Sequence, residues 1–198
     1  MTPSGFILHP QALTGDEQAE LAAEVLQRVG LAPFYHANTP GGRRMSVAMT
    51  NLGPLGWVSD TAGYRYQPHH PQTGAPWPDM PVTLVRLWRR LGQRDDQPDA
   101  CLVNLYDADA RMSLHQDRDE QDLTAPVVSI SLGDTAIFRL GGAARSDSTR
   151  SLRLASGDAC VLAGDARLAF HGVDRIVPGS SRLIPGGGRI NLTLRRAR

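Results

Sequence analysis

Residues 189–195 read R-I-N-L-T-L-R, with polar and aliphatic side chains in strict alternation. A period of two is typical of a β-strand that has one face on an apolar core and the other in polar surroundings. Residues 101–106, C-L-V-N-L-Y, form a second such segment, in which Asn104 and Tyr106 share a face. The two segments predict strands whose polar faces carry arginine, amide and phenol groups.

The rest of the chain predicts a mainly β fold with flanking helices. Short apolar runs broken by Gly, Asp and Pro are typical of a β-sandwich or barrel; they cover residues 101–106, 127–132, 136–140, 151–154, 159–162 and 190–194. Upstream, a helix is expected between the cap residue Thr14 and Gly30, and another over residues 82–91, ended by Gly92. The 198 residues favour one domain, with helices and a lid in roughly 1–95 and the β core in 96–198.

Composition limits the partners and the compartment. The net charge is +1 and every basic residue is arginine, so a nucleic-acid contact requires a local patch. No apolar run approaches the roughly 20 residues of a membrane span, and no leader is apparent, so we expect a soluble cytoplasmic protein without a membrane partner. Cys101 and Cys160 lie in apolar runs and are expected to be buried free thiols.

His115 and Asp117 are candidate metal ligands, because residues two apart on a strand project to the same face. His171 is the candidate third ligand, since it follows an apolar run and precedes Gly172, which permits close backbone approach. Two imidazoles and one carboxylate can hold a ferrous ion and leave positions open for oxygen. Zinc is the alternative metal, but neither cysteine has metal-like spacing. The other histidines, at 9, 36, 69 and 70, are expected to be solvated or locally hydrogen-bonded.

The polar strand faces suit a small dicarboxylate. Arg189, Arg195, Asn104 and Tyr106 supply two guanidinium groups, an amide and a phenol. The two arginines lie about 20 Å apart along a strand, so we expect them at opposite ends of one ligand. An exposed polar face is the alternative interpretation. A ferrous triad beside such a clamp indicates an oxygenase that uses 2-oxoglutarate.

Three stretches of the chain resemble the AlkB family of iron(II)- and 2-oxoglutarate-dependent alkylation-repair dioxygenases. The first is S-V-A-M-T-N-L-G-P-L-G-W at 46–57 with G-Y-R-Y at 63–66. The second runs from D-A-C-L-V-N-L-Y at 99–106 through L-H-Q-D-R-D-E at 114–120. The third runs from F-H-G at 170–172 through R-I-N-L-T-L-R. Together they are far more specific than any one of them.

The resemblance implies a double-stranded β-helix of the jelly-roll type, with a nucleotide-recognition lid at roughly residues 40–80. It implies iron bound by His115, Asp117 and His171, and 2-oxoglutarate bound by Asn104, Tyr106, Arg189, Asn191 and Arg195. It further implies that Trp57 stacks on the damaged base, that Tyr64 and Met45 contact substrate, and that Asp119 and Arg145 lie near the lesion or its backbone. The chain departs from the bacterial repair enzymes at Ile190, Leu194 and Leu162, where they carry aromatic residues; Leu162 leaves the local packing open.

The implied reaction is oxidative demethylation of 1-methyladenine and 3-methylcytosine in DNA, with RNA as a further candidate. It would release formaldehyde while 2-oxoglutarate and O₂ become succinate and CO₂, and it would be carried out by a monomer on single- or double-stranded substrate. Two alternatives stay open. One is a hydroxylase of the same fold that acts on a protein or small molecule, and the other is a catalytically silent reader of methylated nucleic acid.

Overall fold

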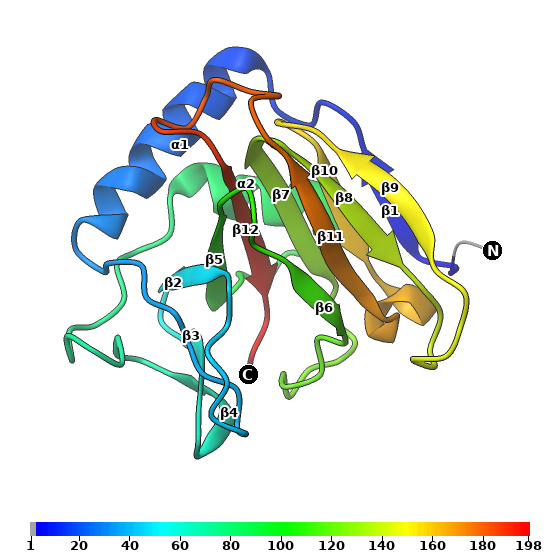
Figure 1. Cartoon of the computed structure of the whole chain (residues 1–198), viewed down its shortest axis with the longest axis horizontal. Helices are drawn as coiled ribbons and strands as arrows, with labels where there is room; N and C mark the ends of the chain where they lie inside the picture. The colour runs from blue at the N-terminus through cyan, green and yellow to red at the C-terminus, as the bar shows by residue number, and fades with distance from the viewer. Residues whose placement is uncertain (1–2) are drawn as a thin grey trace.

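Two antiparallel sheets face each other in the computed structural model, which describes residues 3–198 (Figure 1). The large sheet has the order β1 (Phe6–His9), β10 (Ala159–Leu162), β7 (Val127–Gly133), β12 (Arg189–Arg195), β5 (Ala100–Tyr106), β2 (Ala48–Leu52). The small sheet has the order β6 (Met112–His115), β11 (His171–Val177), β8 (Thr135–Leu140), β9 (Arg150–Leu154). This arrangement is the predicted double-stranded β-helix with flanking helices, so the fold class is confirmed.

Both helices cover the outer side of the large sheet. α1 (Gly15–Val29) and α2 (Val82–Gly92) bury Leu21 and Trp88 in one apolar cluster with Ile190 of β12. The sequence predicted that α2 ends before Gly92, but the helix includes that residue. Gln93 follows it in the left-handed conformation, with φ 53°.

The N-terminus of α1 is held by a capping box. The Thr14 hydroxyl accepts a hydrogen bond from the Glu17 backbone N–H, and the Glu17 carboxylate accepts one from the Thr14 N–H at 2.8 Å. The predicted cap is therefore confirmed. Such a box satisfies two backbone donors that the helix itself leaves unpaired.

We expect Thr14→Ala to lower the free energy of unfolding by about 1 kcal/mol, because the helix loses its side-chain cap. Urea denaturation followed by circular dichroism measures the change. Thr61→Ala, in an exposed turn, is the matched control and should stay within about 0.5 kcal/mol of the parent. Equal stabilities for the two variants would contradict the capping assignment.

The space between the sheets holds the polar face of β12. Its aliphatic side chains Ile190, Leu192 and Leu194 pack toward the helices, whereas a second apolar cluster between the sheets contains Tyr106, Phe138 and others. The polar residues of R-I-N-L-T-L-R are all buried, so the alternative of an exposed polar face is wrong. Here the alternation in sequence marks the inside and the outside of the jelly roll.

A hairpin of β3 (Gly56–Asp60) and β4 (Gly63–Gln67) lies beyond β2, in the region expected to form the lid (Figure 1). His70 follows it and was expected to be solvated or locally hydrogen-bonded; it is buried and locally hydrogen-bonded, and its Nε2 also donates to the distant Pro33 carbonyl at 2.8 Å. His70 Nδ1 accepts from the backbone N–H groups of Gln72 and Thr73. His70 therefore fixes the chain leaving the hairpin.

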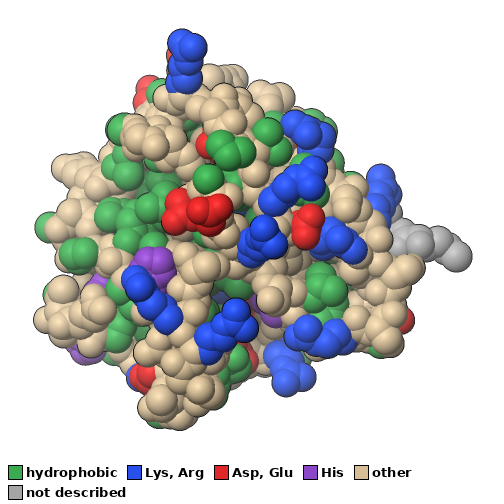
Figure 2. All heavy atoms as spheres, viewed as in Figure 1, with side chains coloured by type: hydrophobic (Ala, Val, Ile, Leu, Met, Phe, Trp, Pro, Cys, Tyr) green, Lys and Arg blue, Asp and Glu red, His purple; other side chains and the backbone are tan. Residues whose placement is uncertain are grey.

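The outer face of the small sheet is toward the viewer in Figures 1 and 2, and basic side chains gather over β11, β8 and β9. Cys101 and Cys160 are buried free thiols, as predicted. Burial raises the pKa of Cys160 to about 11, so this thiol stays protonated. Within residues 3–198 no helix is long and apolar enough to span a membrane.

Candidate functional site

A cavity of about 670 Å³ opens between the two sheets and beside the β3–β4 hairpin. Every residue that the sequence predicted for the site lines this one cavity: His115, Asp117, His171, Asn104, Tyr106, Arg189, Asn191, Arg195, Trp57, Tyr64, Asp119, Arg145 and Met45. They come from both sheets, from the hairpin and from the loops between these elements. The fold therefore brings together residues that the sequence separates by more than a hundred positions.

The His115, Asp117 and His171 side chains converge in this cavity. Their ligand atoms lie within 4.8 Å of one another, and each imidazole Nε2 is 3.8 Å from an oxygen of Asp117. The two histidines are direct partners on the neighbouring strands β6 and β11. Gly172 lets these strands approach, because a Cβ at that position would lie 2.5 Å from the Met112 carbonyl oxygen.

Backbone carbonyls orient both imidazoles in the same way. His115 Nδ1 is 2.9 Å from the Ser113 carbonyl oxygen, and His171 Nδ1 is 2.9 Å from the Ala169 carbonyl oxygen. A carbonyl can only accept, so each Nδ1 carries the proton and each Nε2 has a free lone pair. Burial lowers the pKa of His171 to about 4, so its ring stays neutral. Metal-binding histidines commonly have this outer hydrogen bond.

Asp117 supplies the negative charge of the group. Burial alone would raise the pKa of its carboxyl, but the positive charge of Arg195 lowers it well below the usual range. Its Oδ1 accepts from Arg195 Nη2 at 2.8 Å, whereas its buried Oδ2 has no hydrogen-bond partner. An ionised oxygen without a partner is costly in the interior. The arrangement fits a divalent cation held by two neutral imidazoles and one carboxylate.

The strand argument for Asp117 was wrong in one respect. β6 ends at His115, and Asp117 lies in the irregular segment that follows. Period-two geometry therefore does not place the carboxylate beside His115. Contacts from elsewhere hold it, chiefly Arg195 of β12 and the Arg167 guanidinium, whose Nη1 donates to the Asp117 carbonyl oxygen at 2.5 Å.

Polar residues from three strands form the inner wall of the cavity. The β12–β5 register pairs Arg189 with Tyr106 and Asn191 with Asn104. Arg189 is buried, with Nη2 donating to Ser131 Oγ at 3.0 Å, while its Nε and Nη1 have no partner. Burial lowers the pKa of Arg189, and an anionic ligand would compensate for the desolvation of its charge.

Other members of the wall differ in what they offer a ligand. Burial raises the pKa of Tyr106, so its phenol stays protonated and can donate, and Asn104 Oδ1 is buried without a partner. Asn191 uses its amide N–H groups on Ser129 and the Ile130 carbonyl. Among these residues Arg189 therefore offers unpaired donors, whereas the Asn191 amide donors are already occupied.

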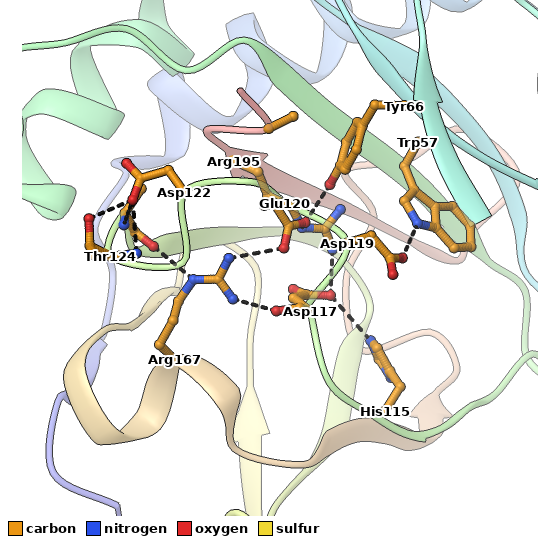
Figure 3. A network of polar contacts seen from close by, with 12 residues as sticks. Trp57, Tyr66, His115, Asp117, Asp119, Glu120, Asp122, Thr124, Arg167 and Arg195 are labelled. Atoms are coloured by element: carbon orange, nitrogen blue, oxygen red, sulfur yellow. Dashed lines mark hydrogen bonds and ion pairs between the residues drawn. The ribbon is translucent and has the colours of Figure 1, made fainter.

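The hairpin brings aromatic side chains to the mouth of the cavity. The Trp57 and Tyr64 rings stack with centroids 5.5 Å apart and an interplanar angle of 20°. Trp57 Nε1 donates to Asp119 Oδ2 at 2.8 Å, so the indole is fixed to the segment that carries Asp117 (Figure 3). Met45 packs partly buried in the same aromatic cluster.

Arg145 lies elsewhere on the rim. Its Nη2 donates to the Leu114 carbonyl oxygen at 2.7 Å, and its guanidinium lies 5.3 Å from the centre of the Phe170 ring. The side chain is thus held near the His115 strand with its charge toward solvent. Of the three departures from the family pattern, Leu162 lines the cavity, whereas Ile190 and Leu194 pack under the helices.

Sequence reasoning missed a buried charge network behind the metal group (Figure 3). Glu120 accepts from Tyr66 Oη of the hairpin and from Arg167 Nη2 at 3.0 Å, and its Oε1 lies 3.4 Å from Arg195 Nε. Arg167 also donates to the Ala125 carbonyl at 2.7 Å. No sequence pattern marked Arg167, which lies on a short 3₁₀ turn, while Glu120 stands next to the candidate residue Asp119.

The fold and this set of groups define an iron- and 2-oxoglutarate-dependent oxygenase, and the family model of the 2OG-Fe(II) oxygenase superfamily matches residues 5–195. The chain is 63% identical to the "Alpha-ketoglutarate-dependent dioxygenase AlkB homolog" of Caulobacter vibrioides, over 98% of this chain and 88% of that protein. It is 46% identical to the Escherichia coli AlkB dioxygenase, over 100% of this chain and 92% of that one. The chain therefore belongs to the AlkB family of dioxygenases, with Fe(II), 2-oxoglutarate and O₂ as its metal and co-substrates.

Solved structures agree with this assignment. The structure of OsALKBH1 superposes with a TM-score of 0.80 at 32% identity, covering 96% of this chain and 97% of that one. A prolyl-4-hydroxylase from Pseudomonas putida gives a TM-score of 0.56 at 16% identity, covering 98% and 93% of the two chains. The second likeness shows the fold alone.

Proposed function

We propose that this protein removes N-alkyl groups oxidatively from 1-methyladenine and 3-methylcytosine in DNA, with RNA as a second substrate. The observation that carries the proposal is the Trp57–Asp119 pair, which closes the same cavity that holds the His115–Asp117–His171 group. Both methylated bases are cations near neutral pH. An indole face and a carboxylate favour a flat cation over the neutral, undamaged base.

The energetics of base capture support a stacking site. An enzyme that acts on a base must extrude it from the stack, at a cost of about a few kcal/mol. Stacking on an aromatic side chain returns about 1 to 3 kcal/mol per base. Trp57 and Tyr64 provide such surface at the cavity mouth, and Asp119 holds the indole in position.

The proposed role of each residue follows from the atoms that its hydrogen bonds leave available. His115, Asp117 and His171 would hold Fe(II), which together with 2-oxoglutarate and O₂ supplies the oxidising chemistry that hydroxylates the N-methyl carbon. The hydrogen bonds of both Nδ1 atoms leave the two Nε2 lone pairs free, so these would bind the metal. The hydroxymethyl product would then lose formaldehyde without further help from the protein.

We propose that Arg189 binds a carboxylate of 2-oxoglutarate away from the metal, with Tyr106 and Asn104 beside it. Arg195 would act at the metal end, because it already holds Asp117. Arg189→Met should raise the KM for 2-oxoglutarate by about 30- to 150-fold, since a charge-assisted hydrogen bond contributes about 2–3 kcal/mol.

Initial rates of succinate formation at varied 2-oxoglutarate measure this effect. Arg89→Met, at an exposed position of α2 outside the cavity, is the control and should leave the KM unchanged. Methionine has a similar length to arginine and no charge, so the buried site should still fold. An unchanged KM in Arg189→Met would remove that residue from the co-substrate site.

The function itself is tested by mass spectrometry of a single-stranded oligonucleotide that carries one 1-methyladenine. Loss of the methyl mass should require iron and 2-oxoglutarate, and formaldehyde should form in equal amount. Succinate without demethylation would point to a hydroxylase that acts on a protein or small molecule. Binding without succinate would point to a silent reader.

Trp57→Ala separates repair from the hydroxylase alternative. It should lower kcat/KM for the methylated oligonucleotide by about 5- to 150-fold, the equivalent of about 1 to 3 kcal/mol of stacking. Succinate formation without nucleic acid should be unchanged, because Trp57 contacts neither the His115 group nor Arg189 in the described structure. Equal kcat/KM values in Trp57→Ala and the parent would contradict base stacking there.

We also propose that the protein works as a cytoplasmic monomer on single- or double-stranded substrate. All groups of the candidate site come from one chain, so the cavity needs no second copy. Size-exclusion chromatography with light scattering tests the oligomeric state.

A further inference from the structure

The outer face of the small sheet carries arginines from three strands. In β8 the side chains of Phe138 and Leu140 pack between the sheets, so Ile137 and Arg139 face outward. The register places Arg153 of β9 and Arg175 of β11 on either side of Ile137. Arg153 and Arg175 are both exposed. Three guanidinium groups therefore share one face that does not line the main cavity.

These charges are not neutralised within the protein. Across residues 3–198, Arg139, Arg153 and Arg175 form no ion pair, and Arg139 instead donates to Thr149 Oγ1 at 2.9 Å. Some arginines on other surfaces are paired, such as Arg65 with Asp60 at 2.8 Å and Arg94 with Asp96. Figure 2 shows this face as the place where basic side chains gather, with few acidic ones among them. With a net charge of only +1, such a patch is a local feature.

A second hollow, beside this face, shares lining residues with the main cavity. It measures about 250 Å³ and is lined by Arg111 and Arg139, by residues 112–114 of β6 and by residues 172–174 of β11, which include the acidic Asp174. Arg111 and the β6 residues also line the main cavity on their other side. Arg111 and Arg139 line this hollow beside the apolar residues Met112, Leu114 and Val173, so guanidinium groups lie along the route from the cavity mouth across β6 to the outer face.

We propose that this face, made of Arg139, Arg153 and Arg175 with Arg111 at its edge, binds the phosphodiester backbone of the nucleic acid that carries the target base. The inference rests on the proposed function and extends it to nucleotides outside the cavity. Guanidinium groups match phosphate geometry, and their pairing releases counterions from the nucleic acid. Substrates long enough to reach the small sheet gain affinity there, whereas very short ones do not.

The test compares salt dependence of binding. Fluorescence anisotropy with an unmodified single strand of about 15 nucleotides gives the slope of log affinity against log salt concentration. The double variant Arg153→Gln/Arg175→Gln should lower the magnitude of that slope by about 2, or about 1 per arginine. Arg86→Gln/Arg89→Gln, two exposed arginines on α2, is the matched control and should leave the slope unchanged.

A kinetic comparison completes the test. In Arg153→Gln/Arg175→Gln the KM for the long methylated strand should rise, while kcat/KM for a methylated trinucleotide stays at the parent value. A parent-like slope and KM in this variant would overturn the proposal, as would an equal loss in the α2 control. If the parent demethylates neither substrate, the proposed function fails, and the salt slopes still decide whether this face binds nucleic acid.

Discussion

Replacing His115 with alanine should lower formaldehyde release from a methylated oligonucleotide by more than about 100-fold. Loss of an outer hydrogen bond to a metal ligand already costs about 10- to 100-fold, so loss of the ligand itself should cost more. The variant should fold normally, because the His115 side chain is 38% exposed. Coupled formaldehyde detection and Mn(II) titration by electron paramagnetic resonance measure activity and metal affinity separately.

His69→Ala is the control for this prediction. His69 is exposed, lies outside the cavity and should have no effect on either readout. A His115→Ala protein that still released formaldehyde at the parent rate would remove His115 from the metal site. Weakened metal binding with full activity at saturating iron would limit its role to metal affinity.

Replacing Arg167 with methionine should lower the free energy of unfolding by about 3 to 5 kcal/mol, because the buried Glu120 carboxylate loses the nearer of its two arginine partners. Only 4% of the Arg167 side chain and 2% of the Glu120 side chain are exposed. Arg167 also pairs with the carbonyls of Ala125 and Asp117, which would lose their donor. Chemical denaturation of the metal-free protein measures the loss directly.

Two further variants test the physical cause. Glu120→Gln combined with Arg167→Met should be less destabilised than Arg167→Met alone, because no buried charge remains without a partner. Arg94→Met removes a partly exposed ion pair with Asp96 and should cost no more than about 1 kcal/mol. Equal losses in the free energy of unfolding for Arg94→Met and Arg167→Met would show that burial does not make the network more stabilising than a partly exposed ion pair.

Much of the fold could be predicted because its signals are local. The capping residues of α1 and the alternation in β5 and β12 depend on neighbours a few positions away, and both appear in the structure. Strands β6 and β11 did not stand out, because they mix buried and exposed residues and their registers shift. The hairpin strands β3 and β4 were also missed, since their pattern is no clearer than that of a loop.

The sequence by itself determined the residue types of the site and the two faces of β12. It did not determine what covers the polar face, because alternation reports which side chains share a face and says nothing of the layer above it. Only the tertiary structure encloses Arg189 and places Arg195 on Asp117, 78 positions away. Likewise, Glu120 and Arg167 meet across 47 positions. Such pairs form only when the two sheets close, so the chain carries no local pattern for them.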